Sequence, residues 1–123
     1  MTENLRPETT YSAIVGRVLA MQRQKCQLEQ ANLASALGIT QSTWSRIESG
    51  ESALTVEQLG LAAGALGTSP AEILRSVDHA VAGLRQRGVN VQHGSPREFA
   101  KQGLALVGAV ALGALIIAIL ARE

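Results

Sequence analysis

Apolar side chains recur every three or four positions along most of the first 85 residues, which is the spacing of one face of an α-helix. The first such stripe predicts a helix over residues 10–25, and its members are Ile14, Val15, Val18 and Leu19. Two later helices begin at predicted capping boxes, formed by Thr55 with Gln58 and by Ser69 with Glu72. The pattern therefore predicts an all-α domain.

Between residues 30 and 50 the pattern predicts two short helices joined by a sharp turn. Gly38 supplies a permissive backbone at the turn, and Thr40 is placed to cap the second helix. We expect the structural core of this motif to consist of Leu33, Ala34, Gly38, Ile39, Trp44 and Ile47. The polar face of the second helix carries Gln41, Ser42, Ser45 and Arg46. Because Gln pairs with adenine edges and Arg with guanine edges, this face is suited to the major groove of DNA.

This stretch resembles the phage-repressor-like (XRE/Cro) helix-turn-helix family, whose pattern is roughly Q-x-x-L-A-x-x-x-G-[IV]-[ST]-Q-x-x-[IVW]-[SE]-x-[IL]-E-x-G. The positions in register are Gln30, Leu33, Ala34, Gly38, Ile39, Thr40, Gln41, Trp44, Ser45, Ile47, Glu48 and Gly50. The resemblance runs from about residue 14 to about residue 74. It implies a five-helix, lambda-repressor-like domain and a sequence-specific transcriptional regulator that binds double-stranded DNA. It also implies that Gln41, Ser42, Ser45 and Arg46 meet base edges, while Gln30 and Thr43 contact the phosphate backbone.

The distribution of charge weakens the DNA hypothesis. Residues 1–77 carry six basic and seven acidic side chains, whereas Lys and Arg supply most non-specific affinity for DNA. The family usually has basic residues in the loop before the fourth helix, where this chain has Glu51, Ser52 and Leu54. The alternative is therefore a membrane-anchored adaptor whose helix-turn-helix domain binds a protein partner, as in bacterial cell-shape proteins that join such a domain to one membrane span.

The sequence shows no catalytic constellation, because it has no glycine-rich phosphate loop and no nucleophile with a plausible base. We expect a protein that is not an enzyme and uses no cofactor. His79 and His93 are too isolated to indicate a metal site. Cys26 is the single cysteine, so no disulfide can form within the chain.

The C-terminal segment from Gly103 to Ala121 has no charged or polar side chain. At 1.5 Å per residue it would be roughly 28 Å long as a helix, close to the thickness of a bilayer core. It is predicted to be a single transmembrane helix that anchors the chain by its tail, the alternative being a buried helix in a soluble oligomer. The basic residues before it predict the cytoplasmic (inner) membrane, with the N-terminal domain in the cytoplasm. These residues are Arg85, Arg87, Arg97 and Lys101.

The predicted organisation is a disordered arm at 1–9, a helix-turn-helix domain with an extended fifth helix at 10–85, a linker at 86–94 and a tail helix at 95–123. A homodimer is expected, because one reading helix covers only a few base pairs. One candidate dimer surface is the extension of the fifth helix, with Val77, Val81 and Leu84. The other is a stripe of small residues in the tail, with Ala105, Ala109 and Gly113. The alternative for the first surface is packing on the domain's own core.

Overall fold

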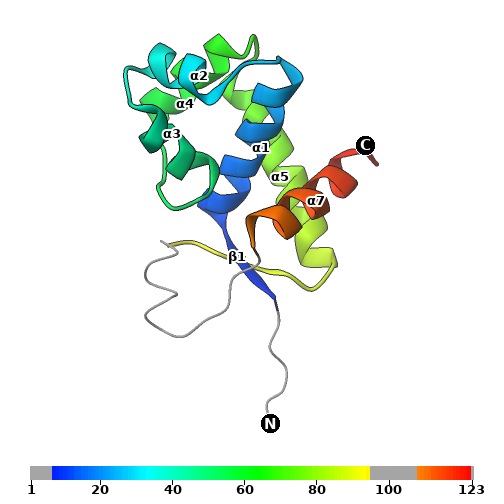
Figure 1. The fold of residues 1–123 in the computed structure, drawn as a ribbon. Coiled ribbons are helices and arrows are strands. Elements are labelled where there is room, and N and C mark those ends of the chain that lie inside the picture. The colour runs from blue at the N-terminus through cyan, green and yellow to red at the C-terminus, as the bar shows by residue number, and fades with distance from the viewer. Residues whose placement is uncertain (1–6, 95–107, 123) are drawn as a thin grey trace.

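The computed structural model of the chain describes residues 7–94 and 108–122, which form six helices and two short strands (Figure 1). In chain order the elements are β1 (Glu8–Thr10), α1 (Tyr11–Lys25), α2 (Gln30–Leu37), α3 (Gln41–Glu48), α4 (Val56–Ala65), α5 (Pro70–Gln86), β2 (Asn90–Gln92) and α7 (Ala109–Leu120). The prediction of an all-α fold with five helices and a membrane-spanning tail is therefore wrong, although the helix-turn-helix pair is present.

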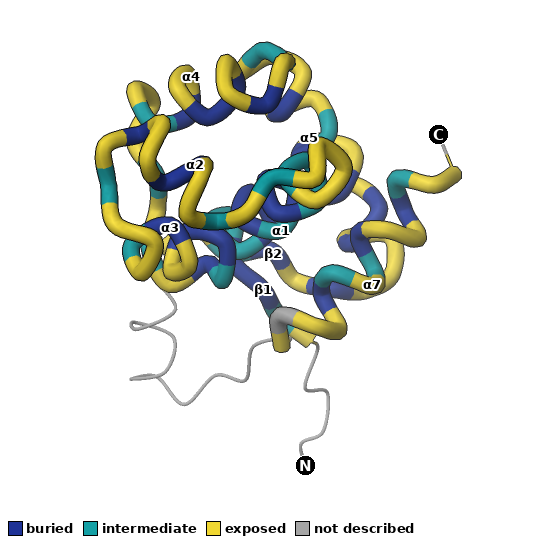
Figure 2. The backbone as a smooth tube through the Cα atoms, turned by 45° about the horizontal axis from the view of Figure 1, so that its top comes forward, coloured by how far each residue is buried: buried dark blue, intermediate teal, exposed yellow. Residues whose placement is uncertain are grey.

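Helix α1 is the element on which the others assemble, since it contacts α3, α5 and α7 (Figure 1). Its predicted stripe is buried, with Ile14 and Leu19 inaccessible to solvent. The helix begins where expected, because the Thr10 hydroxyl accepts a hydrogen bond of 3.0 Å from the amide of Ala13. Along the tube in Figure 2, buried positions line the sides of the helices that face one another.

The two predicted capping boxes differ in their outcome. At the start of α4 both bonds form, because Thr55 accepts from the Gln58 amide at 3.0 Å and the Gln58 side chain accepts from the Thr55 amide at 2.8 Å. At the start of α5 only Ser69 caps the helix, by accepting from the amide of Glu72. The Glu72 carboxylate pairs with Arg75 instead. The second box is therefore only half formed.

Strands β1 and β2 pair in parallel and join the two ends of the domain. Thr9 lies opposite Val91 in this pairing, and both side chains are buried. Val89 and Val91 lie in the segment 86–94 that is predicted to be a linker. Both belong to the core, since they are 4% and 8% exposed. The local pattern does not reveal the strand that pairs with β2, because β1 is polar and lies about 80 residues away in the sequence.

Helix α7 packs on the domain through buried apolar side chains. Leu112, Ile116 and Ile119 are buried, and the helix contacts both α1 and α5. The approach to α5 is close because Gly83 has no side chain: a Cβ there would lie 2.6 Å from Cγ2 of Ile119. The apolar face of this short helix is therefore buried against α1 and α5 of the same chain.

This packing corrects the membrane prediction. Helix α7 has 12 residues and is about 18 Å long, well short of a bilayer core of about 30 Å. No helix in residues 7–94 or 108–122 combines the length and the hydropathy that crossing a bilayer requires. The first part of the predicted span, residues 103–107, lies outside the described residues. The structure contradicts the transmembrane tail anchor and the inner-membrane localisation derived from it.

The predicted dimer surfaces are largely occupied within the chain. Val77, Val81 and Leu84 are 0%, 9% and 0% exposed, as in the alternative in which this stripe packs on its own core. Of the second surface, Ala105 lies outside the described residues and Ala109 is the first residue of α7. A Cβ on Gly113 would lie 3.8 Å from the Cδ of Arg17 in α1. The first of the two surfaces is therefore covered within the chain.

A buried carboxylate connects the first three helices. Glu48 at the end of α3 is 2% exposed, and its Oε2 accepts from Nε of Arg23 at 2.6 Å and from Nε1 of Trp44 at 2.5 Å. Its Oε1 accepts from Arg23 at 3.0 Å and from Gln30 at 2.9 Å. Burial alone would raise the pKa of Glu48, but hydrogen bonds from Arg23, Gln30 and Trp44 outweigh burial and hold it below its ordinary value.

Because the pKa of Glu48 is lower in the folded chain, the unfolded chain binds more protons at low pH. The stabilisation from Glu48 is then fully present above about pH 4.5 and is lost as the pH falls below that value. We predict that Glu48→Gln lowers the free energy of unfolding at pH 7 and that its deficit relative to wild type shrinks towards pH 3. Urea unfolding from pH 3 to pH 7 measures this; a deficit that does not depend on pH would contradict it.

The docking of α7 generates a second prediction, for which the chain provides a matched pair. Ile116→Ala should lower the free energy of unfolding by about 2 to 5 kcal/mol, because Ile116 is fully buried. Ile117→Ala should change it by less than about 1 kcal/mol, because that side chain is 54% exposed. Chemical unfolding of both full-length variants measures the difference. Equal effects would mean that α7 is not docked in solution.

Candidate nucleic-acid interface

Helices α2 and α3 form the predicted helix-turn-helix, and the turn between them is built by local signals. Gly38 ends α2 in the left-handed conformation, with φ of 70°, and the amide of Ile39 donates to the Ala34 carbonyl at 3.0 Å. Thr40 then caps α3 by accepting from the amide of Thr43 at 3.1 Å. The angle between the two helices is therefore set by residues of the motif itself.

The inner face of the motif is packed as predicted. Leu33, Ala34, Trp44 and Ile47 are each no more than 2% exposed, and Ile39 packs against the core at the corner. The outer face of α3 carries the predicted base-reading residues, all exposed: Gln41, Ser42, Ser45 and Arg46. Figure 2 shows exposed and buried stretches alternating along the tube of α3. The structure thus presents a polar helix face on a rigid support, and the DNA contacts of its residues stay a prediction.

Gln30 and Thr43, the predicted phosphate contacts, already have partners within the chain. Gln30 donates from Nε2 to Glu48, and its Oε1 accepts from Nε2 of Gln41 at 3.5 Å, the outer limit of a hydrogen bond. The Thr43 hydroxyl accepts from the hydroxyl of Thr40 at 2.9 Å. Both side chains lie at the rim of the polar face and are partly exposed. Their roles towards phosphate are untested predictions.

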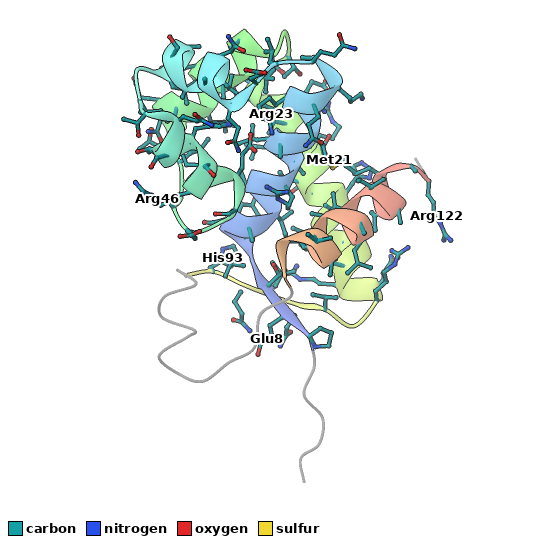
Figure 3. All side chains as sticks on the ribbon, viewed as in Figure 1. Glu8, Met21, Arg23, Arg46, His93 and Arg122 are labelled. Atoms are coloured by element: carbon teal, nitrogen blue, oxygen red, sulfur yellow. The ribbon has the colours of Figure 1, made fainter. Side chains whose placement is uncertain are left out.

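Positive charge near this face is sparse. Arg46 is the single basic residue of α3, and its guanidinium makes no hydrogen bond or ion pair within the described part of the chain. It projects from α3 away from the body of the protein (Figure 3). Arg17 and Arg23, by contrast, point inward, where Arg17 donates to the Glu48 carbonyl at 3.0 and 2.7 Å and Arg23 pairs with the Glu48 carboxylate. Arg46 is therefore the cation that this face offers to a partner.

Sequence reasoning missed the importance of Glu48 and Arg23. In the sequence Glu48 is only a match to the family pattern, and Arg23 lies off the apolar stripe of the first helix, which predicts that it faces outward. The carboxylate of Glu48 at the end of α3 is one available signal, because a buried acid requires a cation. The identity of that cation depends on how α1 and α3 pack, which the local pattern does not contain.

Comparison with known proteins identifies the domain. A family model described as a helix-turn-helix domain matches residues 14–75, about half of the chain. No curated protein matches the chain at a significant level. Among solved structures, the chain resembles two of the clp gene regulator ClgR from Corynebacterium glutamicum. One shares 25% identity over 55% of this chain and 88% of that chain, with a TM-score of 0.53.

The second ClgR structure shares 22% identity and covers 78% of this chain and 93% of that chain, with a TM-score of 0.62. At this identity it supports the fold alone. A structure of cobalt(II) HppE with substrate shares 38% identity over 51% of this chain and 35% of that chain. Its TM-score of 0.48 is too low to bear on function. The matched segment contains α2, the turn and α3 as described above, and the chain belongs to the helix-turn-helix domain family.

Proposed function

We propose that the chain is a sequence-specific DNA-binding transcriptional regulator that reads the major groove with α3 and acts by binding rather than by catalysis. The exposed polar face of α3 carries this proposal. Its outer residues have donors and acceptors that match base edges, while Trp44 and Ile47 hold its inner side against the core. A helix fixed in this way loses little conformational entropy on entering a groove.

The roles follow from position and chemistry. Gln41 at the start of α3 would contact adenine, and Arg46 would contact guanine or a phosphate. Ser42 and Ser45 would bond adjacent base edges, while Gln30 and Thr43 at the rim would hold the backbone. The resemblance to ClgR, which is described as the clp gene regulator, supports a role in transcription.

We further propose that two chains bind one DNA site. The support is geometric, because α3 has eight residues and one such helix reaches only a few base pairs. Two copies would read half-sites about one helical turn apart. Since Val77, Val81 and Leu84 are buried within the chain, the contact between two copies would involve another surface.

A protein partner is the second candidate, and the charge balance favours it. Residues 1–77 carry six basic against seven acidic side chains, and two of those basic side chains, Arg17 and Arg23, serve inside the domain. Helix α4 also exposes Val56 and Leu61, at 87% and 51%. A protein that packs on α4 would use this surface without involving α3.

Substitution of the polar face tests the DNA hypothesis. Arg46→Ala and Gln41→Ala should each weaken binding to a selected duplex by about 1 to 3 kcal/mol, with the melting temperature little changed. Fluorescence anisotropy at fixed salt measures the affinity. Arg85→Ala removes the same charge from the far end of α5 and serves as the matched control. Equal affinity of all four proteins would exclude α3 as the reading element and favour the protein partner.

The stoichiometry of the complex tests the dimer. Sedimentation equilibrium of the full chain with a saturating concentration of the selected duplex should give two chains per duplex. Shortening the duplex to a single half-site should reduce affinity by more than tenfold, because the second chain then has no bases to read. A complex of one chain per duplex with unchanged specificity would contradict the dimer and leave the DNA reading of α3 intact.

A further inference from the structure

The direction of two side-chain amides on the reading face is determined from inside the domain. Glu48 is ion-paired with Arg23 and 2% exposed, so its carboxylate is charged and can only accept hydrogen bonds. Gln30 must therefore turn its NH₂ group towards Glu48, and its Nε2 lies 2.9 Å from Oε1. The carbonyl oxygen of Gln30 is then directed towards Gln41, and the second N–H of its NH₂ group remains for the proposed contact with a phosphate.

The next amide follows from the first. The carbonyl oxygen of Gln30 can only accept, so Gln41 turns its own NH₂ group towards it, at 3.5 Å. With one N–H used in this way, Gln41 keeps its carbonyl oxygen and a second N–H for a partner outside the chain. One acceptor and one donor match adenine, which offers the N7 acceptor and the N6 donor in the major groove. Guanine offers two acceptors there, N7 and O6, and matches this arrangement poorly.

We propose that Glu48, which does not reach the surface, is a positioning residue for base reading: through Gln30 it sets the amide direction of Gln41 and so makes Gln41 prefer adenine to guanine. This inference rests on the proposed function. The side-chain amides of Gln30 and Gln41 have nearly the same shape when turned by 180°, and the carboxylate decides which of the two orientations they adopt. In Glu48→Gln, the amide at position 48 has its own NH₂ group and allows the amides of Gln30 and Gln41 to turn the other way. Gln41 then presents two N–H donors, which match the two acceptors of guanine.

The test uses the full chain and DNA selected from random duplexes. Gln41→Ala first identifies the base pair that Gln41 reads, as the position whose preference that variant loses. Anisotropy titrations at one salt concentration then compare duplexes with A·T or G·C at that position. Wild type should prefer A·T by about 5- to 150-fold. Glu48→Gln should reduce the preference to less than about threefold, and Gln30→Met should do the same.

Trp44→Phe is the matched control. It removes the Nε1 donor to Glu48 Oε2 and so loosens the same buried cluster, but it leaves the bond from Gln30 to Oε1 in place. Its adenine preference should stay within about twofold of wild type. Melting curves identify the folded variants; if Glu48→Gln does not fold, Gln30→Met supplies the comparison with Trp44→Phe.

The outcomes distinguish failure of the positioning role from failure of DNA binding by the chain. Loss of preference in Glu48→Gln and Gln30→Met but not in Trp44→Phe supports the positioning role. Equal loss in all three variants would overturn the positioning role, because it would show a general loosening of the domain. An unchanged preference in folded Glu48→Gln or Gln30→Met would also overturn it, while leaving DNA reading by α3 intact. Selection that enriches no sequence would overturn the proposed function together with this inference.

Discussion

The buried ion pair of Glu48 and Arg23 is the constraint on which the rest of the domain depends. It joins the last residue of α3 to the C-terminal half of α1, and Gln30 brings in the first turn of α2. A carboxylate taken out of water is costly unless its oxygens are satisfied, and here four donors surround it. Removing one partner leaves the other charge buried and unpaired, which in other proteins costs about 3 to 5 kcal/mol. The pair therefore ties α3 to one position on the scaffold, because any other position would leave a buried charge without its partner.

The parts of the structure that depend on local chemistry could be predicted from the sequence. The turn at Gly38, the cap at Thr40 and the burial of Trp44 each follow from a residue type at a helical position, and the structure confirms them. The exposure of Gln41 and Arg46 follows from the same periodicity. Contacts between distant segments could not be predicted in this way. Arg23 and Glu48 are 25 positions apart, so only the packing of α1 against α3 brings them together.

The errors about the tail and the strands have one physical origin. Hydropathy measures how unfavourable a segment is in water, but it does not show whether lipid or protein will cover it. The apolar side chains of α7 that looked suited to a bilayer lie instead on α1 and α5, where Gly83 leaves room for Ile119. Val91 similarly had no visible partner in the sequence, whereas in the structure the distant Thr9 lies opposite it. In both cases the missing information was a complementary surface elsewhere in the chain.

The arrangement of charge is consistent with the proposed function, in which a domain with few cations binds DNA selectively. Arg17 and Arg23 serve the scaffold, so α3, the proposed reading helix, carries Arg46 without the cluster of lysines and arginines that would give strong affinity for any phosphate backbone. A weak non-specific term leaves discrimination to base contacts, since those contacts differ between sequences and phosphate contacts do not. Base contacts discriminate between sequences only when the directions of their donors and acceptors are fixed. The same buried carboxylate that holds α3 in place also accepts from the amide of Gln30, so in the proposed function stability and selectivity depend on one group of side chains.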